Sequence, residues 1–154
     1  MSTLNRKLMI EQLDKKLMKL QILKQVEMPT GGWINAIRTT LNMTLVQLAR
    51  RLKKTPASVK EIEEREKDGS ITLKKMIEVG RALDLDFVYG FVPRDSSIDK
   101  MIEERAEQVA REIVMRTSHN MKLEEQENSE ERLKQAIKDR VDTLKREVPK
   151  HLWD

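Results

Sequence analysis

The sequence predicts an all-α protein with a helix-turn-helix domain, one short β-strand, and helical extensions at both ends. Aromatic residues make up only 3% of the 154 residues, and only four prolines and five glycines interrupt the chain. Its core must therefore be built from Leu, Ile, Val, Met and Ala, which favours helices, because strands draw on β-branched and aromatic residues. Apolar residues also recur at the spacing of amphipathic helices along most of the chain.

Four regions follow from these patterns: an N-terminal helical extension at 1–31, a helix-turn-helix DNA-binding domain at 32–85, a strand at 86–93, and a C-terminal helical region at 94–154. The first helix is expected from about Thr3 to Gln25, where leucines lie roughly three and a half residues apart on one stripe. These leucines are Leu4, Leu8, Leu13, Leu17 and Leu20. The following segment contains Pro29 and two glycines, and it ends the helix.

The DNA-binding domain contains four short helical patterns, and three of them begin at a threonine that can cap a helix: Thr44, Thr55 and Thr72. Gln47 stands three residues after the first of these threonines, which predicts a capping box. Pro56 occupies the first position of the next helix, where its missing N–H costs nothing. The side chains expected to face inward are Trp33, Ile34, Ile37, Leu41, Leu48, Ala49, Leu52, Val59, Ile62, Leu73, Met76, Ile77 and Leu83.

Residues 86–93 form the only strand-like run, with Phe87, Tyr89 and Phe91 alternating with smaller residues. A lone strand leaves its backbone N–H and C=O groups unpaired, so it needs a partner strand. The simplest supplier is a second copy of the chain, which predicts a homodimer that forms through these three aromatic residues. The alternative is an extended tail that lies in a groove.

The C-terminal region is expected to contain two helices. The first begins at Ser96 or Ser97 and the second ends at Pro149. Polar residues 124–129 predict a break between them, and Asn128 with Glu131 predicts a second capping box. The apolar stripes are Ile98, Ile102, Val109 and Ile113 in the first helix, and Leu133, Ile137, Val141, Leu144 and Val148 in the second. Trp153 is expected to pack back onto the protein, with binding to another molecule as the alternative.

Charge is distributed unevenly along a chain of net charge +4. Residues 1–31 carry six basic and three acidic side chains, residues 32–94 twelve and eight, and residues 95–154 twelve and fifteen. A basic centre with an acidic tail suits a nucleic-acid contact in the middle and a protein contact at the end, whereas the plainer explanation is a solubilising surface.

Two short helices joined by a tight turn can place the second helix in a DNA major groove, which is about 12 Å wide. Ser58 and Lys60 can donate to base edges, while Ala57 can contact a thymine methyl group. Glu61 either accepts from cytosine or repels phosphate. The expected DNA contacts are Thr44, Gln47, Arg50, Lys53, Lys54, Thr55, Ala57, Ser58, Lys60 and Glu61, with Arg38 and Arg51 on phosphates.

The sequence MTLVQLARRL at 43–52, followed by Thr55, Val59, Ile62 and Glu63, resembles the Cro/repressor-type (XRE) helix-turn-helix over roughly residues 33–83. The chain departs from that pattern at four positions. Leu45 and Pro56 replace two glutamines, Lys53 replaces the usual turn glycine, and Glu61 replaces a common basic residue. Two hypotheses therefore stay open: a DNA-reading domain, or a degenerate helix-turn-helix that serves as a scaffold.

A narrower likeness extends over nearly the whole chain. The segments LDKKL (13–17), GWI (32–34), AIR (36–38), DGSITL (68–73), VY (88–89), VP (92–93), RA (105–106), VAR (109–111) and LWD (152–154) resemble the bacterial family called mobile mystery protein A. Its members are typically encoded beside mobile mystery protein B, which carries a Fic domain, so the resemblance implies an antitoxin-like partner of a Fic-domain toxin. The Ser/Thr-x-x-x-Glu motif of small Fic antitoxins is matched only by Thr143 and Glu147, and Val148 stands where that motif has Gly or Asn.

Little in the sequence suggests catalysis, so the chain is expected not to be an enzyme and to hold no cofactor or metal. There is no cysteine and no phosphate-binding glycine loop, and His119 and His151 lack ligand spacing. The absence of cysteines suits a reducing cytoplasm, and no apolar run approaches the roughly 20 residues of a membrane span. We therefore expect a cytoplasmic DNA-binding transcriptional regulator, with a protein-interaction antitoxin or scaffold as the alternative.

Overall fold

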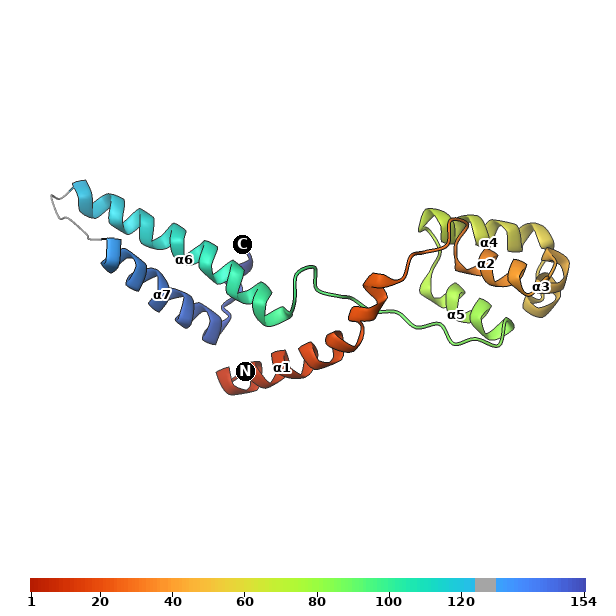
Figure 1. Cartoon of the computed structure of the whole chain (residues 1–154), viewed down its shortest axis with the longest axis horizontal. Coiled ribbons are helices and arrows are strands. Elements are labelled where there is room, and N and C mark those ends of the chain that lie inside the picture. The colour runs from red at the N-terminus through yellow and green to blue at the C-terminus, as the bar shows by residue number, and fades with distance from the viewer. Residues whose placement is uncertain (124–129) are drawn as a thin grey trace. The chain divides into compact units, whose positions relative to one another are not determined.

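The computed structural model describes residues 1–123 and 130–154, with the side chains of 1–117 and 130–154. These residues form seven α-helices and two 3₁₀ helices and contain no strand, so the all-α prediction is confirmed for the described chain. They divide into two compact units, one formed by residues 24–90 and one by residues 1–23 together with 91–154. We call them the central unit and the terminal unit, and Figure 1 shows the helices of each.

The central unit contains α2 (Trp33–Thr40), α3 (Leu45–Leu52), α4 (Pro56–Asp68) and α5 (Leu73–Ala82). Each of these helices buries an apolar stripe, because no helix of this length is stable without tertiary contacts. The stripes meet in one core, which comprises Ile34, Leu48, Ala49, Leu52, Val59, Ile62, Val79 and Leu83. Val79 is the core residue that the sequence pattern did not single out. Four residues that were expected to face inward are exposed instead: Trp33, Leu41, Leu73 and Ile77.

All four helices of the central unit end in the same way. At each end a residue with positive φ is followed by an N–H that bonds back to a carbonyl five residues earlier, such as the 2.9 Å bond from Lys54 to Ala49. This hydrogen bond closes the Schellman motif, which satisfies the last carbonyls of a helix. The left-handed residues are Asn42, Lys53, Gly69 and Asp84.

The terminal unit contains α1 (Thr3–Lys19), α6 (Ile98–Leu123), α7 (Glu130–Glu147) and the 3₁₀ helix η2 (Lys150–Trp153). Its core lies mainly between α6 and α7, where Ala106 and Ala110 are both fully buried. Such small side chains let two helices approach closely. The other buried core residues are Ile102, Val109, Leu144 and Leu152.

The first helix differs from the prediction in length and in orientation. It ends at Lys19 and continues as a short 3₁₀ helix, η1 (Gln21–Gln25). Ile10, rather than the leucine stripe, packs against the core, and Leu4 and Leu8 remain 66% and 46% exposed. Asp14 explains part of this orientation, because its carboxylate accepts from the backbone N–H of Ile98 (2.7 Å) and thereby caps the start of α6.

The chain end is held by Arg105 of α6. Its Nε donates to the Leu152 carbonyl at 2.6 Å, and its guanidinium also donates to the main chain of Asp154. Leu152 is fully buried, whereas the side chain of Trp153 is 51% exposed. The last turn therefore packs back mainly through its leucine.

The predicted strand at 86–93 is absent, and these residues connect the last turn of the central unit to α6 without regular structure. The physical reason is that a strand needs a partner strand to pair its backbone N–H and C=O groups, and the described residues supply none. No backbone–backbone hydrogen bond links residues 86–92 to any other described residue. Phe87 and Tyr89 stack on one another instead, with their ring centroids 5.9 Å apart.

Three expectations lie outside the described residues. They are the break at 124–129, the capping box of Asn128 with Glu131, and the surface position of the His119 side chain.

Candidate nucleic-acid interface

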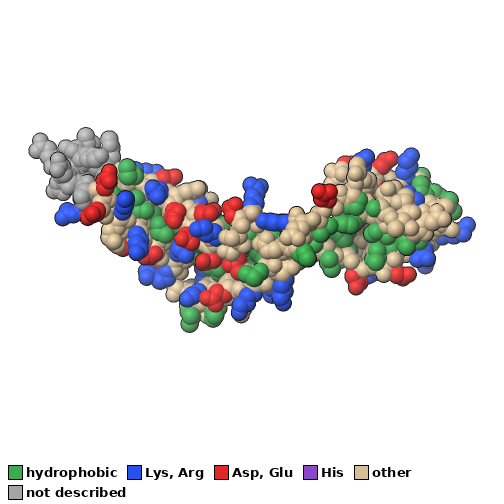
Figure 2. All heavy atoms as spheres, in the orientation of Figure 1, with side chains coloured by type: hydrophobic (Ala, Val, Ile, Leu, Met, Phe, Trp, Pro, Cys, Tyr) green, Lys and Arg blue, Asp and Glu red, His purple; other side chains and the backbone are tan. Residues whose placement is uncertain are grey.

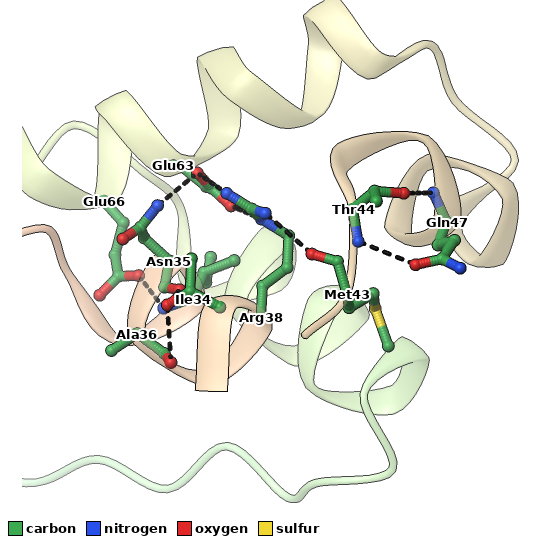
Figure 3. A network of polar contacts seen from close by, with 10 residues as sticks. Ile34, Asn35, Ala36, Arg38, Met43, Thr44, Gln47, Glu63 and Glu66 are labelled. Atoms are coloured by element: carbon green, nitrogen blue, oxygen red, sulfur yellow. Dashed lines mark hydrogen bonds and ion pairs between the residues drawn. The ribbon is translucent and has the colours of Figure 1, made fainter. Parts of the chain in front are cut away.

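The first helix of the candidate interface, α3, begins with the predicted capping box. The Thr44 hydroxyl accepts from the Gln47 N–H at 3.1 Å, and the Gln47 side-chain oxygen accepts from the Thr44 N–H at 2.9 Å (Figure 3). Two otherwise unpaired N–H groups are satisfied in this way. The Gln47 amide nitrogen has no hydrogen bond among the described residues and remains available to a ligand.

The turn between α3 and α4 depends on Lys53, which adopts the left-handed conformation with φ 56° and ψ 43°. Glycine is usual at such a position, since left-handed geometry crowds the Cβ of other residues. The turn closes nonetheless, with the Schellman bonds from Lys53 to Arg50 (3.2 Å) and from Lys54 to Ala49 (2.9 Å). The departure at Lys53 therefore leaves the turn intact at a cost in strain.

The second helix of the candidate interface, α4, begins at Pro56 as expected, with Thr55 as its N-cap. The Thr55 hydroxyl accepts from the Ser58 N–H at 3.1 Å and lies 2.9 Å from the Ser58 hydroxyl. Both hydroxyls are thus engaged in the cap, although each can still accept a further hydrogen bond. The first turn of α4 is exposed at Pro56 and Ala57.

The outward face of α4 lies opposite Val59 and Ile62, which are 0% and 7% exposed. At 100° per residue, Ala57, Lys60, Glu61 and Glu64 share this outward face. All four are exposed. The helix can therefore present its N-terminal half to a groove while its other side is held by the core.

Two of the four glutamates of α4 point into the protein instead. The Glu63 carboxylate accepts from the Arg38 guanidinium at 2.5 Å and from the Asn35 amide at 3.1 Å, and Arg38 also donates to the Met43 carbonyl at 2.9 Å (Figure 3). This network joins α2, α4 and the start of α3. Arg38 was expected on a phosphate, but its side chain is 12% exposed and these bonds give it a structural role.

Glu66 caps the start of α2. Its two carboxylate oxygens accept from the N–H groups of Trp33 and Ile34, each at 2.7 Å, and the residue is 8% exposed. Gly32, with φ 88°, makes room for this carboxylate, because a Cβ there would lie 3.0 Å from it. On a helix that enters a groove, the charge of Glu66 would repel phosphate, but its buried position removes it from the outward face.

The remaining glutamates of α4 are Glu61 and Glu64. Glu61 accepts from Arg65 at 2.7 Å, an ion pair between exposed side chains one turn apart. No ion pair of Glu64 occurs in the described part of the chain. Of the four glutamates, only Glu64 thus presents an unpaired negative charge on the outward face.

Basic residues are concentrated where α3 meets α4. Residues 44–60 contain five basic side chains and no acidic one. Arg51 donates to the Ala82 carbonyl at 3.1 Å and so ties α3 to the end of α5. The other four are Arg50, Lys53, Lys54 and Lys60, and Figure 2 shows Lys and Arg side chains over this end of the central unit.

One neighbour of this basic group was missed at the sequence level. The Glu78 carboxylate of α5 accepts from Lys75 at 3.0 Å and lies 4.0 Å from the Lys54 ammonium. The hydrogen bond from Lys75 lowers the pKa of Glu78, so this carboxylate stays ionised and offsets part of the local positive charge. The three-residue spacing of Lys75 and Glu78 was a visible signal for their pairing, whereas the approach of Lys54 depends on tertiary packing.

Among the described residues, no three His, Cys, Asp or Glu side chains are grouped so that they could hold a metal ion. None of the described helices combines the length and apolarity that a membrane span requires.

Comparison with known proteins gives no relative: no family model, no curated protein and no solved structure matches the chain.

Proposed function

We propose that this protein is a sequence-specific DNA-binding transcriptional regulator that inserts α4 of a Cro/repressor-like helix-turn-helix into the major groove. The main support for this proposal is the distribution of charge around the start of α4, where residues 44–60 contain five basic and no acidic side chains. A strong electrostatic attraction to phosphate is the dominant part of most protein–DNA affinity. The capped, exposed first turn of α4 then provides the groups that face bases.

The burial of two α4 acids supports this proposal. Glu63 and Glu66 are hydrogen-bonded inside the central unit, and Glu61 is paired with Arg65. A helix that is acidic by composition therefore presents much less negative charge to DNA than its sequence indicates. The phosphate contacts that we propose are Arg50, Lys53 and Lys54, with Lys60, Ser58, Ala57 and Glu61 toward bases.

Binding should be tested by titrating the intact protein against its own upstream DNA in a band-shift assay at low and moderate salt. Lys60→Ala should weaken specific binding about tenfold or more, because a base-facing or phosphate-facing cation contributes about 1–3 kcal/mol. Lys67→Ala removes the same charge from the last turn of α4 and is the matched control, with little expected change. Equal effects of the two substitutions would contradict the placement of α4 in the groove.

The competing hypothesis is that the helix-turn-helix is a scaffold, and the exposed Glu64 on the outward face favours it. Glu64→Gln separates the two. If α4 enters the groove, removing this charge should raise DNA affinity several-fold. The dependence of this affinity on salt concentration should change little, since no phosphate contact is gained. If α4 is a scaffold, DNA binding stays absent or unspecific in both proteins.

The resemblance to mobile mystery protein A supports a second part of the proposal, an antitoxin-like interaction with a Fic-domain protein. In the terminal unit, α1 exposes Leu4, Leu8 and Met18, and exposed apolar residues on one helix suit a protein partner. Co-expression with a Fic-domain protein encoded beside this gene, followed by co-purification, tests it. Leu4→Asp/Leu8→Asp should abolish co-purification while it leaves DNA binding unchanged, and loss of both would indicate misfolding.

A further inference from the structure

The connection between α5 and α6 exposes three large apolar side chains. Val88, Tyr89 and Phe91 are 76%, 63% and 86% exposed. Burying an aromatic side chain removes about 150–250 Å² from water, so leaving two of them exposed forgoes a large stabilisation. The backbone of the same segment also has no backbone partner, since no backbone–backbone bond joins 86–92 to other described residues.

This segment has the properties of a strand that lacks its partner. Its side chains alternate, with Phe87, Tyr89 and Phe91 at odd positions and Val88 and Val92 at even ones. None of residues 85–93 has a positive φ, so the backbone needs no strained change to pair. An exposed apolar strand edge with free N–H and C=O groups is a template for another chain.

We infer that residues 86–94 pair with the same residues of a second copy of this chain, antiparallel and about a two-fold axis at Gly90. In this register residue i lies opposite residue 180 − i. Tyr89 then faces Phe91 of the second copy, and Val88 faces its Val92. Because the pairing is isologous, the aromatic contact and the valine contact each form twice.

Charge complementarity selects this register. With the axis at Gly90, Asp86 of one copy lies opposite Arg94 of the other at both ends of the ribbon. An axis at Phe91 instead leaves both charges opposite uncharged residues. An axis at Tyr89 leaves Asp86 opposite a valine and puts Arg94 opposite Asp84, whose left-handed backbone (φ 58°) lies outside the extended segment. Opposite charges on directly facing residues stabilise a strand pair, and the register centred on Gly90 places two such pairs.

Pro93 agrees with the same register. If Gly90 forms the central hydrogen-bonded pair, the even-numbered residues exchange the backbone bonds and the odd-numbered N–H groups point away from the partner strand. Pro93 is odd-numbered and has no N–H to offer, so it leaves no ladder bond unmade. Shifting the axis by one residue, with the axial pair still hydrogen-bonded, would put proline into the hydrogen-bonded set.

A ribbon of this length buries less than a typical stable interface, and two-stranded ribbons alone are marginal. The dimer should therefore dissociate on dilution. The proposed dimer does not depend on DNA, and it is tested without DNA. A failure of the proposed DNA-binding function would therefore leave this test of dimerisation unaffected. It would nevertheless supply the two-fold arrangement with which helix-turn-helix proteins bind symmetric operators.

Cysteine cross-linking in the full chain tests the register, since the natural sequence contains no cysteine. In Gly90→Cys the two introduced residues would face each other with Cα atoms about 5.5 Å apart, within the range of a disulfide. In Val88→Cys the two cysteines would lie about 13 Å apart along the strands and cannot join. Oxidation should thus give a covalent dimer for Gly90→Cys and none for Val88→Cys, whereas a mixture of Val88→Cys and Val92→Cys should form the mixed dimer.

Sedimentation of the unmodified protein over a concentration series gives a second measurement. We expect a monomer–dimer equilibrium that Phe91→Asp shifts to monomer, since this side chain is 86% exposed and its loss cannot disturb the fold. Leu73→Asp is the control, because that exposed leucine lies outside the segment. A monomer at every concentration, or a dimer in which Gly90→Cys cross-links no better than Val88→Cys, would overturn the inference.

Discussion

Lys53 is the left-handed residue of the central unit that is neither glycine nor a short polar residue. Asn42 and Asp84 tolerate positive φ through local hydrogen bonding, and Gly69 has no Cβ to crowd. Lysine has neither property. Lys53→Gly should relieve about 1–2 kcal/mol of strain, less the extra backbone entropy that glycine loses, and raise the free energy of unfolding by about 0.5–1 kcal/mol.

Urea denaturation followed by circular dichroism measures this gain. Asn42→Gly is the matched control at another helix end and should change stability less, since asparagine is already accommodated. If lysine and glycine give equal stability, the turn does not hold residue 53 in the left-handed conformation. DNA affinity should fall in Lys53→Gly even as stability rises, because the cation that we place on phosphate is lost.

Glu66 and Glu64 are neighbours on α4 with opposite environments. Glu66 is buried and accepts from two backbone N–H groups, whereas Glu64 is exposed and has no ion pair among the described residues. Glu66→Gln should cost about 1–3 kcal/mol of stability, since an amide turns a donor toward one of those N–H groups and loses the charge. Glu64→Gln should stay within about 0.5 kcal/mol of the natural protein. Thermal melts of both variants make the comparison, and equal melting temperatures would refute the capping role.

At the scale of elements, the close approach of α6 and α7 depends on small side chains. Ala110 is fully buried between them, while Ala136 on α7 is exposed. Ala110→Leu should destabilise the terminal unit by about 1–3 kcal/mol, because a packed core has no room for the added carbons. Ala136→Leu adds the same atoms on the solvent side and should change stability by less than about 0.5 kcal/mol. Denaturation curves of the two variants that coincide would contradict this packing.

Local signals explain why the helices of the central unit could be predicted. Thr44, Thr55 and Thr72 each accept from the N–H three residues on, as their sequence context indicated. Such caps depend only on neighbouring residues. Pro56 at the first position of α4 and Gly69 after its end follow equally local rules.

The parts that could not be predicted depend on contacts distant in sequence. Glu66 looks like a solvated charge along the chain, and only its partners 32 and 33 residues earlier show that it is buried. The leucines of α1 form a regular stripe, yet Asp14 and Ile10 face α6. The strand at 86–93 is a third case, because alternation predicts strand character and says nothing about whether a partner is present.

At the scale of the whole molecule, each unit has its own apolar core, and each contains one tryptophan. Trp33 lies in the central unit and Trp153 in the terminal unit. The variants Trp153→Phe and Trp33→Phe therefore provide separate fluorescence reports of the two units. Because both indoles are partly exposed, at 38% and 51%, neither substitution should be costly to the fold.

Matched core substitutions in these backgrounds test whether the two cores are independent. Ile62 and Ile102 are buried, one in each core, and Ile→Val should cost about 0.5–1.5 kcal/mol at either position. Ile62→Val should lower the denaturation midpoint that Trp33 reports and leave that of Trp153 unchanged, and Ile102→Val should do the reverse. Independent cores predict this crossed pattern, since a substitution destabilises only the cooperative unit that contains it. If each substitution shifts both midpoints equally, the chain unfolds as one cooperative unit, and the separation of roles that we propose, DNA reading in the central unit and partner binding in the terminal unit, loses its physical basis.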